Sequence, residues 1–216
     1  MLSEICPPAP VIRLLEDQLH TPVSTRVGVG AAGYANHLAT SSYGYPSLDG
    51  WCVWIEPDIT GERGGDYWSW RWINAVRSAF EIWSRAVPVT QVVDSERANI
   101  HVLRKRPSLR EIEQRWRASN GRSLLRIVAV VHGGRFYLEP KVQVLISPSL
   151  ESRMIQNTAL HELGHAFGLW GHSKVEEDIM YFRQGSNSLL RLSHRDQHAL
   201  EWVRTRCVSQ FGRPLL

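Results

Sequence analysis

The chain has 216 residues, of which 43% are hydrophobic and 21% charged, and its formal net charge is +4 at pH 7. This is the size and composition of one globular domain that can bury a sizeable core, and no apolar run is long enough to span a bilayer. A membrane-spanning protein and a small disulfide-scaffolded domain are therefore excluded.

The N-terminal part of the chain has weak hydrophobic periodicity and many turn-forming residues. We expect residues 1–48 to form an N-terminal extension with one short helix near residues 11–19. The regular pattern that follows predicts a folded domain at residues 49–210 and a C-terminal tail at residues 211–216.

Three cysteines, Cys6, Cys52 and Cys207, are too few and too widely spaced for a disulfide framework or a cysteine-only zinc site. We expect Cys6 and Cys207 to be free thiols and Cys52 to be a small core residue. The first thirty residues lack the apolar run of a secretory signal. The compartment is therefore left open, with the cytoplasm as the default.

Short β-prone runs and helical patterns follow one another from Trp51 onward. We expect five strands, at residues 51–55, 89–93, 99–103, 126–131 and 142–146. The polar residues 107–118 are expected to form a helical insertion between two of them. Residues 132–134, His-Gly-Gly, predict a turn.

Three further segments predict helices. Apolar residues recur at helical spacing over residues 72–83, and Pro88 follows them. A second helix is expected from about residue 150 to 167, ending at Gly168. Ser193 and Asp196 resemble a capping box that opens a third helix. Strands and helices without regular βαβ alternation predict an α+β fold.

The segment His161-Glu162-Leu163-Gly164-His165 contains the residues that indicate a metal site most clearly. Histidines at i and i+4 project from the same face of a helix, so both imidazoles can bind one cation. Glu162 lies about 100° around the helix from His161, where its carboxylate can reach a water on the metal. This spacing is that of zincins, in which zinc is the Lewis acid and the glutamate is the general base.

A catalytic zinc needs three protein ligands and one open position. We favour His172 as the third ligand, because the chain can leave the helix at Gly168 and turn back beneath the metal. The alternatives that remain are Asp178, His194 and, more weakly, His198, Glu176 and Glu177.

The motif His161-Glu162-x-x-His165-x-x-Gly168, with a later histidine and methionine, resembles the metzincin endopeptidases and most of all the matrixins. The metzincin third histidine comes three residues after the glycine, whereas His172 comes one residue later. A loop with two glycines accommodates this insertion. The segment Asp178-Ile179-Met180-Tyr181 resembles the Met-turn of the clan. The likeness is sparse but correctly ordered from about Trp51 to Arg206.

The resemblance implies a twisted, mostly parallel five-stranded sheet with three helices, in which the edge strand at residues 127–131 pairs with an extended substrate. It implies a zinc-dependent endopeptidase that cleaves protein or peptide substrates with a zinc-bound water. The residues that it assigns are the ligands His161, His165 and His172, the base Glu162, and Met180 as an apolar floor.

One zinc is expected. The sequence supports neither calcium nor a second, structural zinc, and Cys6 lacks the flanking residues of the matrixin cysteine switch.

Two other features leave a second function open. Nine tryptophans could bind sugars; Trp72 and Trp83 fit a helix core, whereas Trp51, Trp54, Trp68 and Trp70 are undetermined. The basic residues 104–126 are expected to be a solvated face, without the positioned aromatics of a nucleic-acid site. The alternative is a non-catalytic binding module with a vestigial zinc site that binds through the basic patch or the tryptophans. We expect no nucleic-acid or membrane partner, and the oligomeric state is open.

Overall fold

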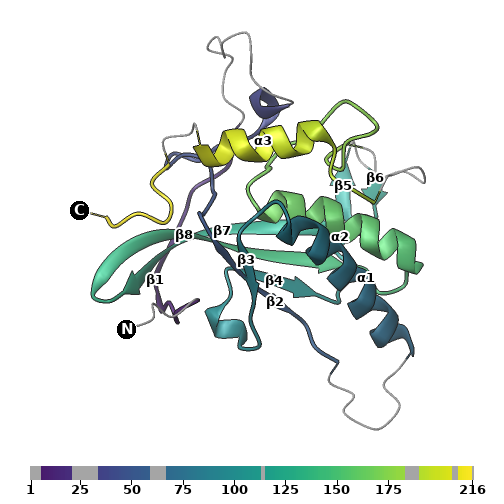
Figure 1. The fold of residues 1–216 in the computed structure, drawn as a ribbon, viewed down its shortest axis with the longest axis horizontal. Coiled ribbons are helices and arrows are strands. Elements are labelled where there is room, and N and C mark those ends of the chain that lie inside the picture. The colour runs from purple at the N-terminus through teal and green to yellow at the C-terminus, as the bar shows by residue number, and fades with distance from the viewer. Residues whose placement is uncertain are drawn as a thin grey trace.

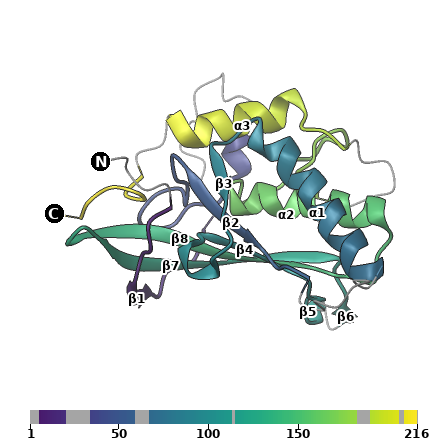
Figure 2. The same cartoon turned by 60° about the horizontal axis from the view of Figure 1, so that its bottom comes forward.

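A computed structural model describes residues 6–20, 34–58, 67–112, 115–182, 190–205 and 209–215. These residues form a mixed six-stranded sheet, and the α-helices pack on one of its sides (Figures 1 and 2). Among them, no helix combines the length and the hydropathy that crossing a bilayer requires.

The main sheet has the strand order β1-β7-β8-β4-β2-β3. Its strands are β1 (Val11–Leu15), β2 (Trp51–Ile55), β3 (Val89–Gln91), β4 (Ile100–Leu103), β7 (Gly121–His132) and β8 (Arg135–Ile146). The pairs β3–β2, β2–β4 and β4–β8 are parallel, whereas β8–β7 and β7–β1 are antiparallel. This confirms the predicted α+β class, with one strand more than the five expected.

The three predicted helices are present as α1 (Tyr67–Ser84), α2 (Ser152–Ala166) and α3 (His194–Thr205). The chain leaves α2 through Gly168, whose φ of 111° favours glycine. The predicted capping box opens α3: Ser193 N donates to Asp196 Oδ2 at 2.9 Å, and Asp196 N donates to Ser193 Oγ at 3.0 Å. The C-terminal end of α2 and the N-terminal end of α3 are therefore fixed by local sequence signals.

Large aromatic side chains pack α1 and α2 against the sheet. Phe167 packs against Trp51 of β2 and Trp83 of α1, with ring centroids 6.0 and 5.5 Å apart. Trp83 Nε1 also donates a 2.9 Å hydrogen bond to the backbone oxygen of Leu160. Burial of each such side chain contributes roughly 1.5–3 kcal/mol. The C-terminal half of α2 is thereby held rigidly against both the sheet and α1.

Two predicted helices are wrong. The run near residues 11–19 instead forms β1, which pairs antiparallel with β7 from Val11↔Val130 to Leu15↔Ile127. Residues 107–118 instead contain β5 (Arg110–Ile112) and β6 (Arg115–Arg117), which form a separate two-stranded sheet. Leu109 there is 53% exposed, so its side chain adds little of the core packing that would stabilise a short helix.

The sheet edge at residues 127–131 also differs from expectation. Its backbone was expected to pair with substrate, but β1 of the same chain pairs with Ile127–Val130. An unpaired sheet edge is a template for any extended strand, and here the nearest one belongs to the N-terminal segment. The part of β7 that β1 leaves uncovered is therefore residues 121–126.

A disulfide corrects the predicted state of two cysteines. Cys6 and Cys52 are bonded, with their Cα atoms 5.8 Å apart and a sequence separation of 46. Arg97 Nε donates to the backbone oxygen of Cys6 at 2.6 Å, which helps to hold this end of the chain. Cys207 lies outside the described residues.

The N-terminal segment also contributes to the core. Tyr34, Leu38 and Leu48 are buried in the same hydrophobic cluster as the helices. Ala39 N donates a 2.6 Å hydrogen bond to the backbone oxygen of Trp170, in the loop that follows α2. Residues far apart in the sequence therefore support the loop that leads to His172.

Candidate metal centre

Three histidines converge at the C-terminal end of α2. His161 and His165 lie one helical turn apart on α2, and His172 comes from the following loop. Each offers a ring nitrogen, and these atoms all lie within 4.8 Å of one another. Ring centroids are separated by 4.8 Å for His161–His165, 5.2 Å for His161–His172 and 4.9 Å for His165–His172. The three side chains can therefore contact one ion.

The loop that carries His172 turns sharply because it contains two glycines. Leu169 N donates to the backbone oxygen of Gly164 at 3.0 Å as the chain leaves the helix. A Cβ atom at Gly171 would collide with the backbone oxygen of His37, so the loop can pack this closely only with glycine. This tight bend accommodates the one-residue insertion before His172.

Two of the imidazoles are oriented by backbone carbonyls. His161 Nδ1 lies 2.8 Å from the oxygen of Ile179, and His165 Nδ1 lies 2.7 Å from the oxygen of Leu169. With Nδ1 donating these bonds, Nε2 of each ring keeps its lone pair. Metal-binding histidines characteristically make such outer hydrogen bonds. The donor set and its support therefore fit zinc.

Desolvation keeps these rings in the neutral form that binds metals, to different degrees: His161 is buried, His165 is half-buried and His172 is exposed. Burial lowers the pKa of His161 to about 4, against the opposing hydrogen bond to Ile179. Desolvation, with the neighbouring histidines, also holds the pKa of His165 well below its usual value, and partial desolvation lowers the pKa of the more exposed His172. The imidazoles are consequently neutral near pH 7.

Glu162 is nearly buried, with 5% of its surface exposed, and it is held by β7. Ser123 Oγ lies 2.7 Å from Glu162 Oε2 and 2.8 Å from its backbone oxygen. A Cβ atom at Gly121 would collide with Thr158 and Glu162, so glycine makes room for the carboxylate. Sequence reasoning missed Ser123 and Gly121, because no local pattern links them to a helix about forty residues away.

Met180 lies beneath the histidine-bearing helix. It is fully buried, and its sulfur packs so closely on Gly164 that a Cβ atom there would collide with it. Gly164 lies between His161 and His165 in the sequence. The glycine of the motif therefore admits an apolar, polarisable side chain directly under the cluster.

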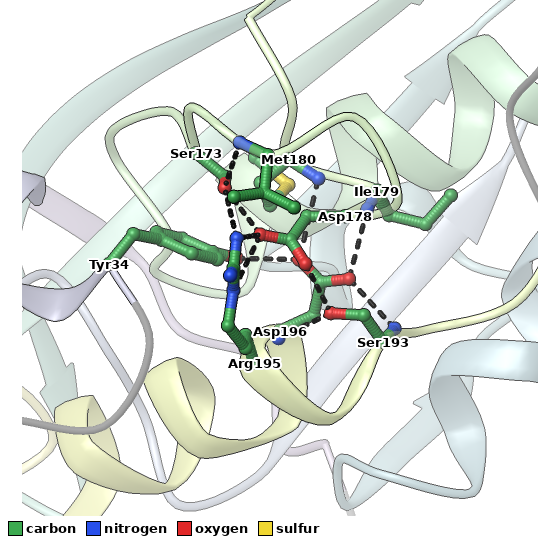
Figure 3. A network of polar contacts seen from close by, with 9 residues as sticks. Tyr34, Ser173, Asp178, Ile179, Met180, Ser193, Arg195 and Asp196 are labelled. Atoms are coloured by element: carbon green, nitrogen blue, oxygen red, sulfur yellow. Dashed lines mark hydrogen bonds and ion pairs between the residues drawn. The ribbon is translucent and has the colours of Figure 1, made fainter.

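A buried carboxylate network fixes the segment that contains Met180 (Figure 3). Asp196 accepts hydrogen bonds from the Tyr34 hydroxyl at 2.8 Å and from the backbone nitrogens of Ile179 and Ser193, each at 2.9 Å. Burial and the Asp196 carboxylate raise the pKa of Tyr34 well above its usual value, which keeps its hydroxyl a donor. We refer to Tyr34, Ser173, Asp178, Ser193, Arg195 and Asp196 as the carboxylate network.

The other candidate ligands lie outside the histidine cluster. Asp178 belongs to the carboxylate network, where its Oδ2 forms a 2.7 Å ion pair with Arg195. His194 instead packs against His198, with ring centroids 4.4 Å apart. Glu176 and Glu177 are exposed. Of the residues considered from the sequence, His172 alone joins His161 and His165.

Comparison with protein families gives a match to the matrixin model over residues 69–203, more than half of the chain. The matched span contains α1, α2, the histidine cluster and most of α3. A search among curated proteins gave no match. Both the arrangement of the fold and the family match lead to the same conclusion: the chain belongs to the matrixin family.

Proposed function

We propose that this matrixin is a zinc-dependent endopeptidase that hydrolyses peptide bonds in protein or peptide substrates. His161, His165 and His172 are the zinc ligands, and Glu162 is the general base. The observation that supports this most is the convergence of three ligand nitrogens within 4.8 Å of one another at the helix that also carries Glu162. A structural zinc site would not need that carboxylate.

Zinc bound by the three imidazoles supplies a Lewis acid for the scissile carbonyl and lowers the pKa of a water molecule. Glu162 accepts the proton of the attacking water and later delivers it to the leaving nitrogen. Ser123, 2.7 Å from Oε2, keeps the carboxylate in position for both transfers. Met180 serves as the apolar floor that holds the ligand-bearing helix in place.

The uncovered part of β7 is the surface along which we expect substrate to lie. Residues 121–126 continue the sheet edge beyond β1 and include Ser123, which contacts Glu162. An extended peptide that pairs with this stretch would bring its main chain next to the proposed base. Because β1 covers Ile127–Val130, only a short part of such a peptide can add to the edge.

The exchange of Glu162→Gln tests the assignment. The variant should still bind one zinc per chain, because no ligand is changed, while peptidase activity on casein or gelatin falls about 100- to 10,000-fold. A chelator should abolish wild-type cleavage, and added zinc should restore it. Full activity in the variant would show that Glu162 is not the general base. If the zinc-loaded wild-type protein cleaved neither casein nor gelatin, the result would instead support the alternative, a non-catalytic binding module with a vestigial zinc site.

The Cys6–Cys52 disulfide bears on the compartment. Disulfides persist in oxidising compartments and are rare in reducing ones, so we infer that the protein works outside a reducing cytoplasm. Thiol titration of the denatured, unreduced protein isolated from its native cell should find one reactive cysteine of the three. Three reactive thiols would contradict this inference.

A further inference from the structure

The first turn of α1 exposes aromatic side chains that a folded domain normally buries. Tyr67 is 62% exposed, Trp68 55% and Trp70 61%. Each such side chain commonly buries about 150–250 Å². The helix buries Trp72 and Trp83 in the core, so these three rings are not needed to hold it in place. Grouped exposed rings of this kind mark binding surfaces.

Two of these rings line a cavity of about 690 Å³. The cavity lies between α1, the C-terminal end of β2 and the residues that follow β3, and it lies within the range of about 300–1,000 Å³ typical of small-molecule sites. Tyr67 and Trp70 line it on the α1 side, and Trp54 lines it on the β2 side. None of its described lining residues belongs to the metal centre.

The aromatic rings of the cavity offer flat faces. The Tyr67 and Trp70 rings lie 6.3 Å apart at an interplanar angle of 29°, one turn apart on the helix. Trp54 is held by the ring of His101, with centroids 5.9 Å apart. Such faces attract the C–H groups of a flat, weakly polar ring, because the π-system carries negative charge on its face.

Polar side chains of mixed type complete the cavity lining. They are two carboxylates, two amides and one guanidinium: Glu56, Asp58, Asn74, Gln91 and Arg77. Together they present both donors and acceptors, which suits hydroxyl groups that donate and accept at once. The two carboxylates outnumber the single cation, which disfavours a phosphate, a sulfated ligand or an anionic lipid surface.

We propose that this cavity binds a neutral saccharide, with the C–H face of a pyranose ring on Trp70 and Tyr67 and its hydroxyl groups on the amide and carboxylate side chains. A purely apolar peptide would offer these polar groups no hydrogen bond, whereas sugar hydroxyls would add to contacts that they already make, such as the 2.8 Å bond from Arg104 N to Glu56 Oε2. The site would hold the protein on a glycan, whether free or carried by a glycoprotein, at a surface separate from the metal centre.

Binding of neutral oligosaccharides to the Glu162→Gln chain tests the proposal without any demand on peptidase activity. The probes are cellohexaose, chitohexaose and maltohexaose, measured by calorimetry and by tryptophan fluorescence. At least one should bind and change the fluorescence. Trp70→Ala should weaken that binding about tenfold or more, because it removes a stacking face.

Trp68→Ala is the matched control, because Trp68 lies on the same helical turn and is similarly exposed but does not line the cavity. It should leave saccharide affinity unchanged. Equal loss in both variants, or no binding of any of the three probes at millimolar concentration, would overturn the proposal. Binding of an apolar peptide or of phosphatidylserine vesicles that depends on Trp70 while saccharides fail would overturn it in favour of that partner.

Discussion

The histidine cluster and the carboxylate network share one peptide segment but are built in opposite ways. Ile179 joins them: its carbonyl oxygen lies 2.8 Å from His161 Nδ1, and its nitrogen donates to Asp196 at 2.9 Å. In the carboxylate network, Asp178 and Asp196 accept bonds from hydroxyl, backbone and guanidinium donors (Figure 3). In the histidine cluster, one ring nitrogen of each histidine instead lies within 4.8 Å of the other two.

This difference separates a structural cluster from the proposed metal site. A buried carboxylate is stable only when donors and positive charge surround it, so the carboxylate network holds the chain in one conformation. In the histidine cluster, the bonds that Nδ1 donates in His161 and His165 leave the Nε2 lone pairs for a ligand. Loss of a residue from the network should therefore reduce stability, and loss of a histidine should reduce metal affinity.

The largest expected effect on stability is that of Asp196→Ala. The change leaves the Tyr34 hydroxyl and the nitrogens of Ile179 and Ser193 without their acceptor. Removal of one member of such a buried network costs about 3–5 kcal/mol, so the free energy of unfolding of the zinc-free chain in urea should fall by that amount.

The matched variant is His172→Ala. It should leave the zinc-free stability almost unchanged, within about 0.5–1 kcal/mol, because the ring stabilises little beyond the ion. Its zinc affinity, measured by competition with a chelator, should be strongly reduced. If the two variants lost stability equally, the distinction between the two clusters would be wrong.

The same contrast explains what the sequence could predict. His161, Glu162 and His165 follow from the helical repeat alone, and the capping box of α3 follows from Ser193 and Asp196. Both depend on residues within one or two turns. The Ser193–Asp196 pair was predicted as a cap, but its bonds to Tyr34 and Ile179 were not, because these partners lie elsewhere in the chain.

Long-range pairing accounts for the errors. Residues 11–19 have only weak periodicity, and the edge of β7 supplies backbone partners to this segment from more than one hundred residues away, so it forms a strand instead of the expected helix. The Cys6–Cys52 bond depends on that same placement of the N-terminal segment. The contact between Ser123 and Glu162 could not be predicted from the sequence, because it depends on the strand register, which no local residue pattern indicates.

The second prediction concerns pH, where the histidine cluster should destabilise the zinc-free chain in acid. Burial lowers the pKa of His161 to about 4, whereas an unfolded histidine titrates near its ordinary 6.5. Between these values the unfolded chain binds more protons, so the free energy of unfolding decreases as the pH falls, by about 3 kcal/mol for this residue across the window.

Urea unfolding at pH 7 and at pH 4.5 measures this loss. His161→Gln is the matched variant, because it retains a polar side chain that does not titrate and leaves all other acids in place. Its stability should fall less over the same window. An equal fall in both proteins would show that other groups cause the acid sensitivity.

The smallest effect expected is on catalysis, through Ser123→Ala. Its hydroxyl lies within bonding distance of Glu162 Oε2, and loss of such an outer contact typically costs about 10- to 100-fold in activity. We expect kcat to fall about tenfold with zinc content unchanged and the acid limb of the pH–rate profile displaced, because the carboxylate loses a donor. Ser123→Thr, which keeps the hydroxyl, should recover most of the rate. A Ser123→Ala enzyme with the wild-type kcat and pH profile would mean that β7 only packs against the general base, and that the carboxylate is positioned by α2 alone.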